Sequence, residues 1–353
     1  MAAIHHLIHC DAEAIATWER AAPTLDDDPQ ARIVVLSPEL PLDAALELIP
    51  CWRADTPEAS WIEVQVRVRG ANGWSRFYRI AAWDSASEQS RRSSFADQRD
   101  DDGRVATDTL IATRPASAAQ LRVLLCAEPG ADMPDLEDVT ICVSGPEAAA
   151  PAFVAPPATP AIALPLLLSQ YAYPEGAGWC SPTAVSMALA YWRAQRPDLP
   201  LDAFADAACV AQVAAPQIFD PAWEGTGNWA FNTAFAAAHG LHAYVTRLHS
   251  LEQVARWTAA GVPVIISISW QVGQIDGAPG STAGHLTMVI GFGGGTALMA
   301  EPAGRGGSEA ILRSYPADQL FARWQAASRG TVYLIYPPDW PTPTAGPDDA
   351  WIS

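Results

Sequence analysis

The sequence contains no lysine. Its 353 residues include 21 basic side chains, and every one of them is arginine. The absence excludes Schiff-base chemistry on a lysine, and it excludes a phosphate loop ending in Gly-Lys-Ser/Thr. The arginines form no basic run, and the formal net charge is −18. Because such a charge repels a phosphate backbone, we expect no nucleic-acid partner.

Metal-binding patterns of cysteine are also missing. The six cysteines form no C-x-x-C pair and show no Cys/His spacing typical of a zinc site, so we expect reduced thiols, no metal and no cofactor. His5, His6 and His9 could bind a metal transiently, but their apolar-polar alternation favours an opening strand.

Long apolar segments are absent as well. No charged segment precedes an apolar core at the N-terminus, so no signal peptide is visible. The longest apolar stretch, around residues 262–270, is too short to cross a bilayer. We therefore expect a soluble, cytoplasmic protein with no membrane span, although the sequence predicts no oligomeric state.

The composition supports two folded domains. Half of the residues are hydrophobic and 17% are charged, which is enough for two cores in a chain of this length. Residues 146–165 (PEAAAPAFVAPPATPAIALP) are rich in alanine and proline and predict a semi-extended linker. The predicted organisation is an accessory domain at 1–145, a linker at 146–161, a second domain at 162–340 and a tail at 341–353.

The first domain shows strand periodicity. In residues 61–70 (WIEVQVRVRG) hydrophobic and polar residues alternate, which predicts a half-buried antiparallel strand. Asn72-Gly73 predicts a hairpin turn into residues 74–83, and residues 119–126 and 138–145 repeat the alternation. Short strands separated by turns predict an all-β sandwich.

Two features of this domain have a functional and a structural interpretation. The tryptophans could form a ligand-binding strip, although such residues more often fill a core: Trp52, Trp61, Trp74 and Trp83. The run Asp100-Asp101-Asp102-Gly103 could bind calcium. It lacks the other spaced oxygen ligands and the distal glutamate, so an acidic surface turn is favoured.

The second domain mixes both periodicities. Helices are predicted mainly in its first part and strands mainly in its last, which indicates an α+β domain with an antiparallel sheet. The predicted helices are 181–192, 228–240, 251–261 and 317–327, and the predicted strands are 263–270, 285–292, 296–302, 310–316 and 331–337.

Four residues of this domain together suggest nucleophilic catalysis. Cys180 precedes Pro182 at a predicted helix N-terminus, where the helix dipole favours the thiolate. His285 begins a strand after a Gly/Ser-rich loop, and Glu301 follows one turn and one strand later, so antiparallel pairing would bring them together. The amide of Gln170 could stabilise an oxyanion.

Each of these residues alone has a plainer interpretation. A single cysteine is most often a buried small hydrophobic residue, a single histidine is usually structural, and a glutamate before proline is commonly a loop acid. The combination is harder to dismiss, because the order Gln, Cys, His, acid is that of papain-type enzymes.

Longer motifs resemble family 39 of the cysteine peptidases, in its stand-alone C39-like branch of the papain-like clan. The resemblance covers residues 162–337 and rests on SQYAYPEGAGWCSPTAVSMALAYW, GTGNWAFNTAFAAAHGL, GHLTMVIGF and TVYLIYP. LIPCWRADTPEASWIEVQVRVRG and GRVATDTL resemble the β-rich N-terminal region of those proteins, which are often secreted. The resemblance implies a papain-like fold with Cys180 as nucleophile, His285 as general base and Gln170 as oxyanion donor.

The sequence departs from this family at one position. The family usually has aspartate before the last Pro-Ala motif, where this chain has Glu301, whose extra methylene must be accommodated if it is to orient His285. No transporter motif is present, so a double-glycine leader delivered to an exporter is not the expected substrate.

The sequence thus predicts a cysteine peptidase that hydrolyses a peptide or protein substrate through a Cys-His-acid triad and a thioester. The segment 225–232 (GTGNWAFN) could be a groove wall or a helix cap with buried aromatics. The alternatives are an amidase or acyl transferase on the same triad, or a relict peptide-binding protein. Predicted substrate contacts are Gly178, Trp179, Asn228, Trp229 and Gly284.

Overall fold

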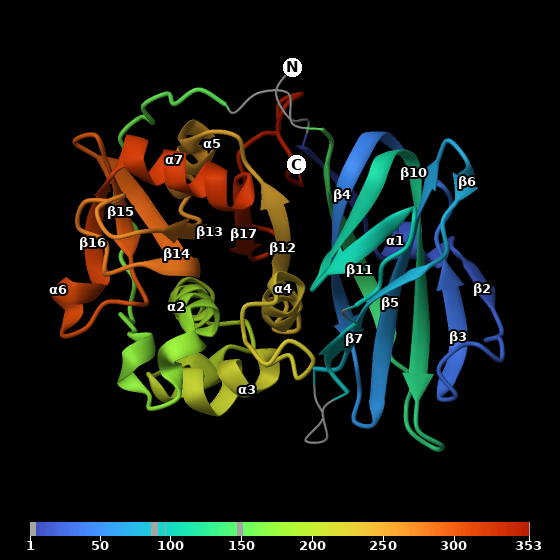
Figure 1. The fold of residues 1–353 in the computed structure, drawn as a ribbon. Coiled ribbons are helices and arrows are strands. Elements are labelled where there is room, and N and C mark those ends of the chain that lie inside the picture. The colour runs from blue at the N-terminus through green and yellow to red at the C-terminus, as the bar shows by residue number, and fades with distance from the viewer. Residues whose placement is uncertain (1–4, 86–90, 96, 147–150, 353) are drawn as a thin grey trace.

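The computed structural model describes residues 5–85, 91–95, 97–146 and 151–352. Figure 1 shows a strand-rich part, in blue and teal, beside a mixed part of helices and strands, in green to red. The two parts correspond to the all-β and α+β regions that the periodicity predicts. Residues 1–4 of the predicted opening strand and residues 147–150 of the predicted linker lie outside the described residues.

The N-terminal domain is built almost entirely of strands. In the described residues they are connected into one 11-stranded sheet whose main path is β1-β11-β4-β10-β5-β7-β8. The elements are β1 (His5–Cys10), α1 (Ala12–Ala16), β2 (Glu19–Ala21), β3 (Ala31–Leu36), β4 (Leu40–Asp55), β5 (Ser60–Gly70), β6 (Gly73–Trp74), β7 (Tyr78–Trp83), β8 (Ser93–Ser94), β9 (Gly103–Ala106), β10 (Thr109–Ala127) and β11 (Asp135–Ser144).

The long strand β10 holds this domain together. It pairs with β9 and β4 near its start and with β5 and β3 farther along, with register shifts where the neighbour changes. The sheet-rich character is as predicted, but the hydrogen bonds join the strands through β10 into one continuous network instead of two separate sandwich sheets.

Strand β5 differs from the prediction of a half-buried strand. Val64 and Val66 are buried as expected, but Glu63 and Gln65 on the other face are buried too. Glu63 accepts two hydrogen bonds from the Arg79 guanidinium at 2.7 and 2.6 Å, and the Gln65 amide donates to Glu63 at 2.7 Å. Period-two polarity cannot distinguish a solvated face from one whose carboxylate is buried and paired with an arginine of the next strand.

The tryptophans of this domain are mainly core residues. Trp52, Trp61 and Trp83 are buried, which favours the core interpretation over a ligand-binding strip. Asp100, the first residue of the acidic run, accepts hydrogen bonds from the Tyr78 hydroxyl, the Arg76 guanidinium and the amides of Asp102 and Gly103. Its carboxylate therefore closes a turn.

The C-terminal domain is an α+β unit, as predicted. Its sheet is antiparallel, with the order β12-β17-β13-β14-β15-β16 in the described residues. The strands are β12 (His242–Arg247), β13 (Val264–Trp270), β14 (Thr282–Gly293), β15 (Thr296–Ala300), β16 (Leu312–Pro316) and β17 (Thr331–Tyr336). The edge strand β12 was not among the predicted strands.

Helices pack around this sheet. α2 is buried along nearly its whole length, because its small residues let it pass close to the sheet. The helices are α2 (Cys180–Gln195), α3 (Ala215–Ile218), α4 (Trp229–Ala237), α5 (Leu251–Ala259), α6 (Ser308–Ile311) and α7 (Ala317–Ser328), and the short helical turns are η1 (Gln170–Ala172), η2 (Gly176–Gly178), η3 (Asp202–Phe204) and η4 (Val210–Ala214).

The segment before the second domain follows its sheet. Thr159 and Ile162 donate backbone hydrogen bonds to Phe292 and Ile290 of β14, at 2.9 and 2.8 Å. The described helices include none long and apolar enough to cross a membrane.

The two domains meet at helix α4. Phe231 of α4 packs against Trp52 and Trp83 of the first domain, with ring centroids 6.4 and 5.2 Å apart. Aromatic packing of this kind leaves the first domain docked on the second.

Candidate active site

Cys180 is the first residue of helix α2. Its N-cap is Trp179, and Pro182 occupies the first turn, where a missing amide proton costs no helical hydrogen bond. The thiol is partly exposed. Its side chain interacts with that of His285 and with the backbone amide of Leu286, and Cys180 and His285 line the same cavity. The structure thus brings together the predicted cysteine and the predicted histidine.

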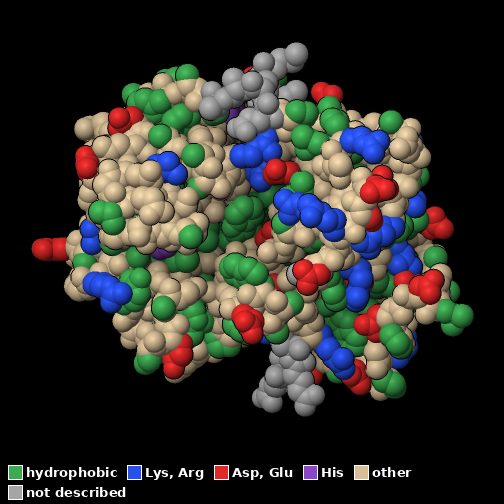
Figure 2. All heavy atoms as spheres, viewed as in Figure 1, with side chains coloured by type: hydrophobic (Ala, Val, Ile, Leu, Met, Phe, Trp, Pro, Cys, Tyr) green, Lys and Arg blue, Asp and Glu red, His purple; other side chains and the backbone are tan. Residues whose placement is uncertain are grey.

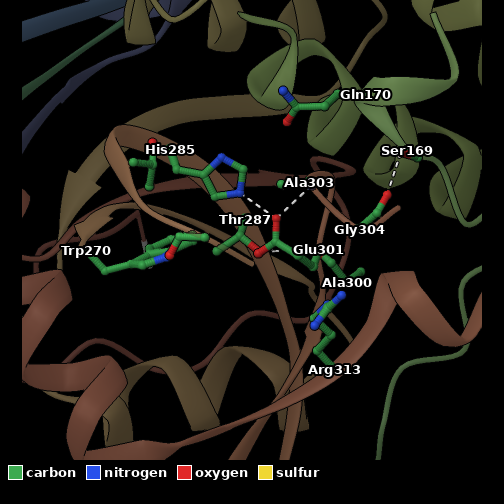
Figure 3. A network of polar contacts seen from close by, with 12 residues as sticks. Ser169, Gln170, Trp270, His285, Thr287, Ala300, Glu301, Ala303, Gly304 and Arg313 are labelled. Atoms are coloured by element: carbon green, nitrogen blue, oxygen red, sulfur yellow. Dashed lines mark hydrogen bonds and ion pairs between the residues drawn. The ribbon is translucent and has the colours of Figure 1, made fainter. Parts of the chain in front are cut away.

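His285 lies on β14 and faces Glu301, which directly follows β15. The two strands are antiparallel, with Met288 opposite Ala300, so the first residue after β15 comes beside the start of β14. His285 Nε2 lies 2.5 Å from Glu301 Oε1, as Figure 3 shows. The other ring nitrogen, Nδ1, is the one left for Cys180.

The Glu301 carboxylate is completely buried, and both of its oxygens accept hydrogen bonds. Besides His285, it accepts hydrogen bonds from the Ala303 amide at 2.8 Å and from the Tyr315 hydroxyl at 2.9 Å. The Trp270 ring stands edge-on to the imidazole, 5.2 Å between centroids. These contacts fix the orientation of the imidazole and show that the longer side chain of glutamate is accommodated.

The charges of the three groups support one another. Burial raises the pKa of the Cys180 thiol, but its hydrogen bond to His285 and the histidine's charge outweigh that effect, so the pKa is lowered. Burial lowers the pKa of His285, yet the Glu301 charge and the Cys180 contacts raise it to about 10. Despite burial, the same histidine lowers the pKa of Glu301. The arrangement favours a thiolate–imidazolium pair beside a carboxylate.

The other five cysteines are different. Burial raises the pKa of Cys10 to about 11 and that of Cys51 to about 12, and it also raises the pKa values of Cys126, Cys142 and Cys209. Since the thiolate is the reactive form, the geometry distinguishes Cys180 from all of them.

Gln170 lies beside the turn that leads into α2. Its backbone N–H donates a hydrogen bond to the Pro302 carbonyl at 2.9 Å. Its Nε2 donates to the carbonyls of Gly176 and Ala177, both at 3.0 Å, and its buried Oε1 has no partner among the described residues. The resting side chain therefore braces the turn before Cys180.

A cavity of about 960 Å³ opens at these residues. Cys180 and His285 line it, as do three of the predicted substrate contacts, Gly178, Trp229 and Gly284. Its size is at the upper end of the range for ligand-binding clefts.

Two of the predicted substrate contacts do not line this cavity. Asn228 is buried as the N-cap of α4, where it accepts from the Phe231 amide at 3.1 Å and donates to Asp220 at 2.9 Å. Trp179 packs against Tyr173 with tilted rings, 5.7 Å between their centroids. Asn232, also buried in this segment, donates to the carbonyls of Thr226 and Asn228.

Two residues beside the site were not predicted from the sequence. Tyr315 and Trp270 contact the Glu301–His285 pair from the neighbouring strands β16 and β13, and no local pattern marks them. The described part of the chain holds no group of three or more His, Cys, Asp and Glu side chains suited to a metal ion. His9 instead contacts Asp138 at 2.7 Å, and His5 contacts Ser144 at 2.9 Å.

A cysteine at a helix N-terminus, joined to a strand histidine and a buried acid behind a sheet-rich domain, is the architecture expected of a C39-like peptidase. Family models match both parts of the chain. Residues 166–332 match the Peptidase C39 like family, and residues 30–144 match the Peptidase C39 N-terminal domain. The resemblance to the C39-like peptidases predicted from the sequence is therefore confirmed.

Solved structures with similarity to this chain include two of this kind. A C39-like peptidase from Bacillus anthracis is 15% identical with a TM-score of 0.33, covering 48% of this chain and 93% of its own. A double glycine motif protease from an AMS/PCAT transporter, solved in complex with the leader peptide, is 17% identical with a TM-score of 0.29. That match covers 50% of this chain and 94% of the other. No curated protein matches this chain.

Proposed function

We propose that the protein is a cysteine peptidase that hydrolyses peptide bonds at Cys180. The observation that carries the proposal is the series Cys180, His285 and Glu301: His285 is hydrogen-bonded to Glu301 and lines one cavity with Cys180, and each group's pKa is shifted toward its charged form. A structural cysteine gains nothing from a buried imidazolium and carboxylate, whereas a nucleophile needs both.

The steps follow from these positions. The Cys180 thiolate attacks the scissile carbonyl carbon, and the imidazolium of His285 gives its Nδ1 proton to the departing amine as the C–N bond breaks. The product is a thioester on Cys180. Neutral His285 then takes a proton from water, whose oxygen attacks the thioester, and the acid product leaves as the thiolate forms again. Throughout, Glu301 orients the ring and stabilises its charge.

The α2 N-terminus would stabilise the oxyanion of each tetrahedral intermediate. The first amides of a helix have no intrahelical acceptor, so the Cys180 amide is available as a donor. We assign the second donor to Gln170, one of whose amide protons would have to leave the carbonyl of Gly176 or Ala177 for the oxyanion. This arrangement is the papain-like part of the proposal.

Replacement of Gln170 by alanine tests that assignment. We expect Gln170→Ala to lower kcat about 10²- to 10³-fold, the usual cost of losing one oxyanion donor, with a smaller change in KM. Steady-state kinetics and thermal unfolding, measured on the same preparations, separate the two possible roles. A lowered Tm with unchanged kcat would limit Gln170 to bracing the turn.

A peptide library tests the function itself. Cleavage by the wild-type protein, absent with Cys180→Ala, would support a peptidase, and the cleaved sequences would define its specificity. Including an amine nucleophile in the same reactions tests the acyl-transferase alternative, because the thioester would then appear as an amide product. A wild-type protein that neither cleaves any peptide nor forms an acyl-enzyme contradicts the proposal.

A further inference from the structure

The cavity at Cys180 is bounded by both domains. Besides residues of the C-terminal domain, the turn between β9 and β10 lines it with Ala106, Thr107, Asp108 and Thr109, and Ile111 of β10 lines it too. Figure 2 shows hydrophobic side chains gathered in the hollow between the two halves of the molecule. The N-terminal domain is therefore part of the surface that a substrate at Cys180 meets.

This wall is fixed in place by a buried contact across the domains. The Asp108 carboxylate accepts hydrogen bonds from the first two amides of α4, Trp229 at 2.6 Å and Ala230 at 3.3 Å. A second oxygen accepts from the Thr109 hydroxyl at 3.0 Å. A carboxylate at a helix N-terminus is favoured by the helix dipole. This contact therefore fixes the turn on the C-terminal domain before a substrate binds.

Two ion pairs also connect the domains beside this cavity. Arg247 of β12 contacts Glu47 of β4 at 2.5 Å, and Arg329 contacts the same carboxylate at 3.1 Å. Glu47 and Arg247 line the cavity together with Asp108, but their charges already have partners. Glu224, the remaining acidic residue that lines the cavity, is exposed to solvent. The charged groups of the lining therefore do not favour a charged ligand.

An exposed aromatic ring belongs to the same cavity. Trp223 is 48% exposed, although most large aromatic residues of this protein are buried. Its ring lies over the backbone of Gly225 and Gly227, where an added Cβ would come within 2.8 Å of ring atoms. The two glycines leave room for the indole to lie against the backbone, and about half of the residue stays exposed as an apolar surface.

We propose that Trp223 and the Ala106–Thr107 turn form an apolar subsite shared by the two domains, which binds a hydrophobic side chain of the peptide substrate close to the scissile bond. The inference rests on the proposed peptidase function and names its specificity. The occupant is an extended peptide because the cavity is continuous with Cys180, and its side chain is apolar because the charged lining groups are paired or solvated.

Two substitutions on opposite domains test this subsite. Trp223→Ala removes the aromatic surface, and Ala106→Trp fills the space from the other side. For a peptide with a hydrophobic residue at the preferred position, we expect each to lower kcat/KM at least 10-fold, mainly through KM. Cleavage of the same peptide with glycine at that position should change less than 3-fold.

Matched controls use residues of the same kind outside the cavity. Phe219 is 42% exposed and does not line it, so Phe219→Ala controls for Trp223→Ala. Ala21 is an exposed strand residue on β2 at the far side of the N-terminal domain, so Ala21→Trp controls for Ala106→Trp. Both controls should keep wild-type kinetics, and all four variants should keep the wild-type rate of Cys180 alkylation by iodoacetamide.

The outcomes separate this inference from the proposed function. A wild-type enzyme that cleaves peptides with no preference for a hydrophobic residue overturns the subsite while the peptidase remains. The same holds if Trp223→Ala and Ala106→Trp cleave both peptides as the wild type does. If Cys180 alkylates no faster than the other thiols and no peptide is cleaved, the peptidase proposal fails and the subsite fails with it.

Discussion

Cys180→Ser is expected to abolish peptide hydrolysis, lowering kcat by roughly 10⁴- to 10⁶-fold, as loss of a nucleophile does in other triads. The hydroxyl is nearly the same size as the thiol, so α2 and the Glu301–His285 contact should remain intact. The serine, however, has no tendency to form an anion beside the imidazolium. The measurement is kcat on the best peptide from the library.

The control for this variant is Cys209→Ser. Cys209 is a buried thiol just before η4, which packs on α2, and its pKa is raised by burial. We expect this variant to keep wild-type kcat. Equal activity of Cys180→Ser and the wild-type protein would show that another group attacks the substrate.

Glu301→Gln is expected to lower kcat by roughly 10- to 10⁴-fold while the protein stays folded. Losing an orienting carboxylate can cost about 10⁴ in a serine triad, and a preformed thiolate–imidazolium pair depends on it less. Glu301→Asp, the residue usual in the family, should keep kcat within about 10-fold. Glu309→Gln serves as the matched control, because Glu309 is an exposed glutamate close in sequence.

The Glu301→Gln substitution should also shift the pH dependence of activity. Glu301 helps to raise the pKa of His285 to about 10, so wild-type activity should fall only as the pH rises through that value. A neutral amide removes this stabilisation, and His285 then loses its proton at lower pH. The alkaline limb of kcat/KM should therefore move to lower pH in Glu301→Gln. An unchanged limb, with His285→Ala inactive, would mean that another residue supports the imidazole.

The central residues were accessible from the sequence because their placement is local. Cys180 precedes a proline that marks a helix start, and His285 and Glu301 belong to strands joined by a short turn, which pair as neighbours in an antiparallel sheet. Such patterns predict which side chains meet without knowledge of the rest of the fold.

Other parts of the site depend on contacts between distant segments. The turn before Thr109 reaches the cavity from the other domain. Tyr315 reaches Glu301 from β16, the next strand of the sheet, but no motif marks it as a partner. Gln170 was predicted as a donor to substrate, yet which of its amide atoms faces the site depends on the carbonyls of Gly176 and Ala177. Side-chain direction of this kind is decided by tertiary packing.

The fold shows the same division. The strand over residues 61–70 and the hairpin after it were predictable from alternation and Asn72-Gly73. The burial of Glu63 was not, because its partner Arg79 comes from the next long strand, and Glu63 is buried while the Arg79 side chain stays partly exposed. The alternation of residues predicts the strand, while the side chains contributed by neighbouring strands determine whether its polar residues are buried.

The reactivity of all six cysteines across pH tests the central claim most directly. With limiting iodoacetamide and peptide mass spectrometry, Cys180 should be labelled first, and it should still react near pH 6, because its pKa is lowered and the other five are raised. His285→Ala should remove this advantage. If the wild-type Cys180 reacted no faster than Cys10 or Cys209 near pH 6, the thiolate–imidazolium pair and the peptidase built on it would be contradicted.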